Sequence, residues 1–175
     1  MVGKTKKPAG VHVLLVVSSD GHVMPPFFFK KGESVTKEVY LDALSRHVKP
    51  WMTATAAGRS YVFQQDGAPA HNSHLVQNWL SDEIIIIIII IIIIIMVWTK
   101  EFWPPSSPDL NPMDYYVWGV LERKTNKRAH NSIDSLRDAI EEAAANMNSD
   151  HLVNACKRFR ARVEAAIQAE GSWFE

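Results

Sequence analysis

The sequence predicts one α/β domain whose sheet is built from the N-terminal half of the chain. Short apolar, β-branched segments come first, and segments with helical spacing of apolar residues come last, an order typical of strands covered by helices. At 175 residues the chain is long enough for one domain with a real core and too short for two. Its composition, 47% hydrophobic and 22% charged, is that of a globular protein.

A hairpin is expected at the start of the domain. Residues 11–18 (VHVLLVVS) have the composition of a buried strand, and Ser19-Asp20-Gly21 has that of a tight turn. Residues 22–29 would then return as a second strand. Pro25 and Pro26 lack a backbone N–H, so this strand should be irregular or lie at an edge. A further short strand is expected at residues 61–64.

Five helices are expected from apolar spacing and capping residues. Asn111 and a proline in the first turn favour a helix over residues 112–124. Ser132 and Ser149 are candidate N-caps of two later helices, which would form a C-terminal helical pair over residues 131–175. The two remaining helices are expected at residues 36–51 and 71–80.

Cysteine content and charge bear on the cellular location of the chain and on its binding partners. The single cysteine, Cys156, excludes an internal disulfide and agrees with an intracellular location, and the N-terminal sequence does not resemble a signal peptide. The net charge of zero combines +5 in residues 1–60 with −5 in residues 61–120. Two interpretations stay open: chance, or an acidic metal-binding centre beside surfaces that meet a polyanion.

Twelve consecutive isoleucines at residues 84–95 form an anomalous insertion. With residues 96–98 the apolar run is 15 residues long, shorter than the roughly 18 to 20 needed to cross a bilayer, so we expect no membrane association. A well-packed core usually contains side chains of varied shape, which a run of identical isoleucines does not provide. An expanded codon repeat and unread positions written as isoleucine both remain open as sources of the run.

Two segments carry candidate catalytic acids. In YVFQQDGAPAH (residues 61–71) an apolar strand would deliver Asp66 to the edge of a sheet, although an Asp-Gly turn that merely closes a strand fits the same pattern. In WPPSSPDLNPMDYYVW (residues 103–118) Asp114 falls in the first turn of a helix, where any acid is favoured by the helix dipole. Asp109 is better explained by turn chemistry.

Together these segments resemble the second and third acidic motifs of mariner-type transposases, in the DDE/DDD transposase and integrase superfamily. The family pairs a QQD-x-AP-x-H block with a WPP-x-SPDLNP block, and both are nearly intact here. An aspartate at position 114 resembles the mariner branch more than its glutamate-bearing relatives. The resemblance extends over most of the chain, including VVSSDGHVMPP, YLDALSRHVKPW, VWGVLERKTN and CKRFRARVEAAIQAEG. Between Asp66 and Asp114 lie 47 residues, and the spacing becomes typical of the family once the isoleucines are subtracted.

The resemblance implies a ribonuclease-H-like mixed sheet with flanking helices. It also implies cutting and joining of DNA with two Mg²⁺ (or Mn²⁺) ions, for which carboxylates are suitable ligands. Asp66 and Asp114 would be the catalytic metal ligands. His71 and Asn111 would support them, although a plain helix-start histidine explains His71 equally well. The implied partner is transposon-end DNA in the nucleus, and a homodimer is left open.

The family needs a third acid, on the first and central strand of its sheet. That strand should precede Met1, because the hairpin at residues 11–29 corresponds to strands two and three. We therefore expect residues 11–130 to form an incomplete, truncated core, part of a catalytic domain that spans residues 1–175 and is inactive alone. Whether the chain is itself an enzyme stays open. The alternative is a catalytically silent remnant that binds DNA or protein.

A basic cluster follows the second acidic segment. Contact with DNA phosphates and a simply solvated surface explain it equally well. The cluster consists of Arg123, Lys124, Lys127 and Arg128.

Overall fold

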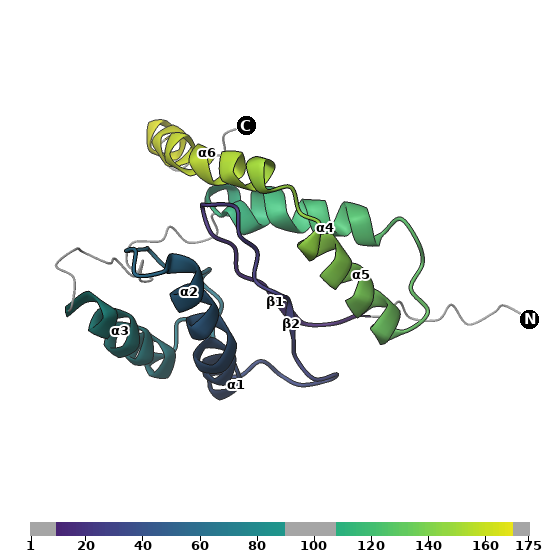
Figure 1. Cartoon of the computed structure of the whole chain (residues 1–175), viewed down its shortest axis with the longest axis horizontal. Coiled ribbons are helices and arrows are strands. Elements are labelled where there is room, and N and C mark those ends of the chain that lie inside the picture. Colours follow the sequence, from purple (N-terminus) through teal and green to yellow (C-terminus); the bar gives the residue numbers. More distant parts are fainter. Residues whose placement is uncertain (1–9, 90–107, 170–175) are drawn as a thin grey trace, which may run out of the picture. The chain divides into compact units, whose positions relative to one another are not determined.

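A computed structural model describes residues 10–89 and 108–169, without the side chains of residues 84–89 (Figure 1). The chain divides into two compact units. The first unit combines Met1–Glu33 with Asp109–Glu175, and the second unit is Ser34–Pro108. Asp114 therefore belongs to the first unit and Asp66 to the second.

The first unit opens with the expected hairpin. Strand β1 (Val13–Leu14) pairs antiparallel with β2 (Phe27–Phe28), with Leu14 opposite Phe27. Nearer the turn, Val17 pairs with Val23. From the Leu14–Phe27 pair to the Val17–Val23 pair, the first strand covers three residues and the returning strand covers four. The returning strand thus carries one extra residue in the stretch that contains Pro25 and Pro26, and the expected irregularity is confirmed.

The tip of the hairpin requires glycine for two reasons. The turn is closed by hydrogen bonds between Ser18 and His22, and Gly21 has a φ of +90°. A Cβ atom at Gly21 would also clash with Oγ of Ser149. The tip therefore packs directly against the start of the last helix.

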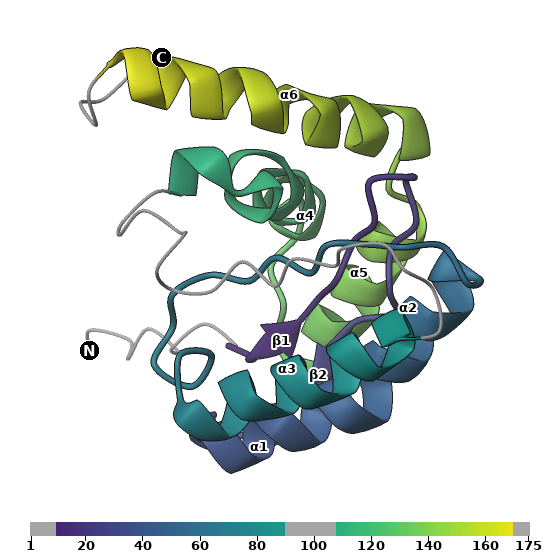
Figure 2. The same cartoon turned by 90° about the vertical axis from the view of Figure 1, so that its left-hand side faces the viewer.

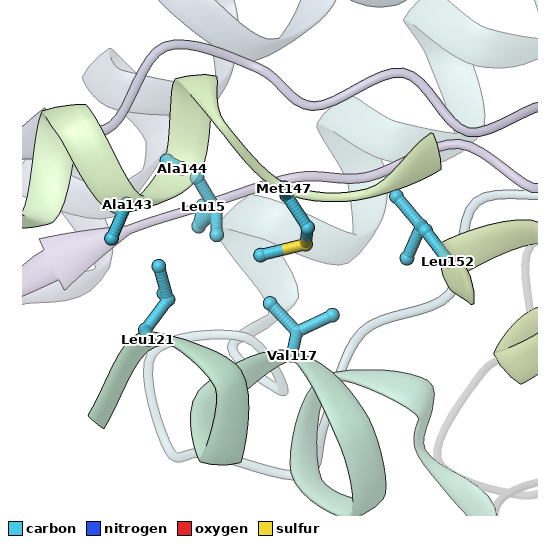
Figure 3. Close-up of a cluster of buried hydrophobic side chains, with 7 residues drawn as sticks. All are labelled: Leu15, Val117, Leu121, Ala143, Ala144, Met147 and Leu152. Carbon is cyan, nitrogen blue, oxygen red and sulfur yellow. The ribbon is translucent and has the colours of Figure 1, made fainter. Parts of the chain in front are cut away.

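The helical part of the first unit encloses a small apolar core. Helix α4 (Trp118–Thr125) packs against α5 (Ile133–Ala145), and α6 (Ser149–Gln168) contacts the π-helical turn η3 (Met113–Val117). A short 3₁₀ turn, η2 (Pro108–Leu110), precedes them. Figure 3 shows the core, which one residue of the hairpin also enters. It consists of Leu15, Val117, Leu121, Ala143, Ala144, Met147 and Leu152.

The capping expectations for the last two helices hold with one correction. Ser132 caps α5, because its hydroxyl accepts a hydrogen bond from the backbone N–H of Ser135 at 3.1 Å. For α6 the expected cap, Ser149, is wrong by one residue. Asn148 caps this helix instead, accepting from the N–H of His151 at 2.8 Å. Asn and Ser are both good N-caps, so their adjacency left the choice to tertiary structure.

Helices make up most of the second unit. An unbroken helical stretch consists of α1 (Lys37–Ala43), the π-helical turn η1 (Leu44–Val48) and α2 (Lys49–Ala56). It ends at Ala57, which adopts the left-handed conformation with a φ of +49°. Helix α3 (His74–Ile89) lies beside α1, as Figure 2 shows.

The strand expected at residues 61–64 is not observed as part of a sheet. Phe63 is buried and Val62 is 52% exposed, so the side chains alternate as they would in a strand. A ladder also needs a second backbone, and none pairs with this segment in the described part of the chain. The expected mixed sheet is therefore reduced there to the two-stranded hairpin.

Part of the isoleucine run continues α3. The helix includes Ile84–Ile89, while residues 90–95 of the run and residues 103–107 of the second acidic segment lie outside the described residues. Among the described residues no helix has both the length and the apolar character needed to cross a membrane.

The core of the first unit predicts a contrast between two positions on α6. Leu152 is fully buried, so Leu152→Ala should lower the free energy of unfolding by about 2 to 5 kcal/mol. Ile167 is 71% exposed, and Ile167→Ala should change it by less than about 0.5 kcal/mol. Urea denaturation of the whole chain measures both. Equal effects of the two substitutions would show that α6 is not packed as described.

Candidate functional site

The first acidic segment forms a tight turn around Asp66 in the second unit. The side chain of Asp66 is 56% exposed. Its Oδ1 atom accepts a hydrogen bond from the backbone N–H of Ala68 at 3.0 Å and lies 2.6 Å from Nδ1 of His71. The turn is also closed by Asn72, whose side-chain amide donates to the carbonyl of Gly67 at 2.7 Å. His71 and Asp66 are thus brought together, as the supporting role requires.

The imidazole of His71 is itself held in place. Its ring stacks on that of Tyr40, with centroids 4.1 Å apart and planes inclined by 29°. The hydroxyl of Tyr40 donates to Oε1 of Gln65 at 2.9 Å. The backbone carbonyl of His71 accepts hydrogen bonds from the amides of Gln65, at 3.4 Å, and Gln77, at 2.7 Å. A carboxylate oxygen can only accept, so a hydrogen bond between Nδ1 of His71 and Asp66 is donated by an Nδ1–H group.

These contacts keep the carboxyl group of Asp66 ionised. The hydrogen bond from His71 lowers the pKa of Asp66, and the N–H of Ala68 and the charge of His71 act in the same direction against partial burial. Burial, and secondarily the charge of Asp66, raises the pKa of Tyr40, which therefore remains a protonated donor. The result is an exposed, anionic carboxylate held within a hydrogen-bonded turn.

The second acidic segment places Asp114 near the start of a helix in the first unit. Asp114 is exposed and lies in the first turn of η3. The buried Asn111 acts as a cap: its Oδ1 accepts from the N–H of Met113 at 3.0 Å, and its carbonyl accepts from the N–H of Asp114 at 2.9 Å. π-Helical turns are rare and are often found at functional sites. The arrangement suits a ligand role and equally suits an ordinary helix-start acid.

Tyr115 ties this segment to α6. Its hydroxyl donates to the backbone carbonyl of Ala155 at 2.7 Å, and burial raises its pKa to about 12. The guanidinium of Arg162 lies 4.4 Å from the centre of the Tyr115 ring and donates to the carbonyl of Asp109 at 3.0 Å. Sequence analysis assigned no site role to four residues that contact the two segments: Tyr115, Arg162, Tyr40 and Gln65. The only local signal was that Tyr115 and Gln65 directly adjoin the two acids.

The basic cluster has mixed local roles. Nζ of Lys124 donates to the carbonyls of Asn146 at 2.7 Å and Ala143 at 3.4 Å, so it stabilises the C-terminal end of α5. Nε of Arg123 donates to the carbonyl of Gly119 at 3.0 Å. Lys127 and Arg128 are exposed beyond the end of α4. Contact with DNA at these residues stays a prediction.

The residues at both acids fit hard divalent cations. Carboxylate oxygens are the ligands that Mg²⁺ prefers, and both side chains are exposed. Across residues 10–89 and 108–169, no group of three or more histidine, cysteine, aspartate or glutamate side chains converges as a metal site would require. Asp66 and Asp114 are candidate cation ligands on the chemistry of their side chains.

Comparison with known proteins identifies the fold. The structure resembles the catalytic domain of Mos1 mariner transposase with a TM-score of 0.78 at 19% sequence identity, covering 94% of this chain and 76% of that one. The ribonuclease-H-like fold class is thus supported. The Mos1 paired-end complex with Mn gives a TM-score of 0.77 at 21% identity, covering 99% of this chain and 48% of that one.

Sequence comparison identifies the family. A family model described as DDE superfamily endonuclease matches residues 3–137. The Tcb2 transposase of Caenorhabditis briggsae is 28% identical over 96% of this chain and 56% of its own length. The Tc1 transposase of Caenorhabditis elegans is 30% identical over 75% of this chain and 43% of its own length. The chain belongs to the DDE superfamily endonucleases, and it spans about half the length of these two curated relatives.

The lowered pKa of Asp66 predicts an acid-dependent loss of stability. The ionised group stabilises the folded state above the pKa that it has in the unfolded chain, and this contribution is lost as the pH falls through the lower folded value. Asp66→Asn should therefore cost stability near neutral pH, and the cost should shrink as the pH falls from about 5 to about 2. Urea denaturation at several pH values measures this. A cost that is independent of pH would contradict the lowered pKa of Asp66.

Proposed function

We propose that this chain is part of a transposase that cuts and joins DNA, with Asp66 and Asp114 as ligands of divalent cations. The observation that carries the proposal is the ionised, exposed carboxylate of Asp66, held by His71 in the QQDGAPAH segment of a DDE superfamily endonuclease. Catalytic-domain structures of Mos1 transposase have been solved with Mg and with Mn, which supports the choice of cation.

The residues of this chain would bind and orient rather than react. Two bound divalent cations would supply activation of the attacking oxygen and stabilisation of the leaving oxygen. Asp66 would hold cations through the carboxylate that His71 orients, and Asp114 would do so from the start of η3, which Asn111 caps. His71 would act as a hydrogen-bond donor that orients the carboxylate, because its Nδ1 atom faces Oδ1 of Asp66.

We further propose that a third carboxylate, from outside these 175 residues, completes the cation site. Asp20 is a poor candidate because it lies in the turn of the hairpin, next to Gly21, which packs on Ser149. With that third carboxylate supplied from elsewhere, the cation site of this chain alone would be incomplete. The complete protein would act on transposon-end DNA in the nucleus, with a homodimer as one arrangement. Mos1 has been solved in paired-end complexes, including one with the left transposon end.

A second candidate function is a silent remnant that binds DNA or protein through α6. This helix exposes Lys157, Arg158 and Arg160 along with the apolar side chain of Ile167. Basic side chains on an exposed helix are suited to phosphate contact. Saturable DNA binding that weakens with salt, together with a failure to bind Mn²⁺ at Asp66, would favour this function over the first.

The cation proposal predicts selective effects of Mn²⁺ on nuclear magnetic resonance spectra. Micromolar Mn²⁺ should broaden the backbone signals around Asp66 and around Asp114 before others, because a paramagnetic ion acts on nearby nuclei. Asp66→Asn should abolish the broadening around residue 66, and Asp114→Asn should abolish the broadening around residue 114. Asp42→Asn and Asp109→Asn are matched controls in the same two units and should leave the broadening unchanged. Broadening that survives Asp66→Asn would refute the ligand assignment.

The missing ligand predicts inactivity of the chain by itself. Incubated with Mg²⁺ and labelled DNA that carries a transposon end, the 175-residue chain should produce no nicked or joined product, because one cation ligand is absent. Gel electrophoresis of the labelled strands is the measurement. Reproducible nicking that disappears in Asp66→Asn would show that the site is complete without a further carboxylate.

A further inference from the structure

We propose that Tyr40 is a positioning residue for Asp66, acting through His71 and Gln65. This inference rests on the proposed function, because it concerns how a cation ligand is held. Tyr40 lies on α1, is 2% exposed, and is 26 positions before Asp66 in the sequence. Its side chain contacts residues on both sides of the acid.

Tyr40 makes two different contacts to the turn. The face of its ring stacks on the imidazole of His71, five residues after Asp66. Its hydroxyl donates to Gln65, the residue directly before Asp66. Gln65 in turn donates to the backbone carbonyl of His71 and so joins the two ends of the turn. The buried side chain of Tyr40 thereby fixes the position of the turn that carries Asp66.

The consequence for Asp66 is the choice of one carboxylate orientation. His71 and Ala68 both contact Oδ1. Both contacts thus fall on the same oxygen, Oδ1, of a side chain that is 56% exposed. A side chain that is 56% exposed has little packing to favour one rotamer. The contact with the imidazole of His71 favours the rotamer that points Oδ1 toward Nδ1. The imidazole can do so only while its ring is held with Nδ1 toward the acid.

A purely structural role for Tyr40 makes different predictions. If the ring only packs between α1 and the turn, Tyr40→Phe retains that packing. The substitution should then cause a small loss of stability and leave the His71 tautomer and the Mn²⁺ dependence unchanged. If Tyr40 positions the acid, removing the hydroxyl should loosen Gln65 and the turn while the fold persists. Tyr61 offers a matched control in the same unit, because its hydroxyl is buried and has no hydrogen-bond partner among the described residues.

The test uses the whole chain with Tyr40→Phe, Tyr40→Leu and Tyr61→Phe. The first readout, without metal, is the long-range ¹H–¹⁵N spectrum of His71 at about pH 8, above the ordinary pKa of histidine. It shows which ring nitrogen carries the proton. We expect the Nδ1–H form to predominate in the unmodified chain and in Tyr61→Phe, to decline in Tyr40→Phe, and to decline further in Tyr40→Leu.

The second readout is the Mn²⁺ concentration needed to broaden the signals of residues 66–72. Tyr40→Phe should raise it by about two- to tenfold, the effect of losing one hydrogen bond that orients a ligand, while Tyr61→Phe leaves it unchanged. Unchanged His71 spectra and Mn²⁺ dependence in Tyr40→Phe would overturn the positioning role. If Asp66→Asn retains the broadening while Tyr40→Phe alters the His71 spectrum, the positioning contact stands and the cation function fails. If Tyr40→Leu does not fold, Tyr40→Phe alone decides.

Discussion

An exposed carboxylate has almost no packing of its own, so its position depends on buried neighbours. Both candidate ligands of this chain meet that constraint in the same way. Asp66 is exposed, but the buried Tyr40 holds the turn around it through two contacts. Asp114 is exposed, but Asn111 and Val117, at either end of the same turn, are buried. Any function of the acids is therefore set by the packing of residues that do not themselves bind a cation.

The helices and the hairpin could be predicted because their signals are local. Ser132 caps α5 as expected, and the turn at residues 19–21 closes as its composition indicates. The contact of Tyr40 with His71 could not be predicted, because 30 residues separate the two in the sequence. Tyr40 falls within the helix expected at residues 36–51, but apolar spacing predicts a helix without revealing which residue a buried side chain will contact. The π-helical turns have no sequence signal of comparable strength.

The candidate site was only partly predictable for a similar reason. The motifs indicated Asp66, Asp114, His71 and Asn111 as candidate site residues, and their roles stay predictions. In the structure His71 contacts Asp66, and Asn111 accepts hydrogen bonds from the turn that carries Asp114. The expected strand at residues 61–64 shows the limit of pattern reading. Alternation along this segment correctly indicates a buried Phe63 and an exposed Val62. Pairing is a property of two segments, and one sequence pattern does not reveal whether the second is present.

The hydrogen bond from Tyr115 to Ala155 makes the segment around Asp114 dependent on a helix that begins 35 residues later. A nonsense codon placed before Ser149 would leave both motif acids in the translated product. It would nevertheless remove Ala155, and with it Arg162, which stacks on Tyr115 and binds the carbonyl of Asp109. Gene copies shortened in this way would keep an intact motif in their coding sequence and lose the support that holds it in position.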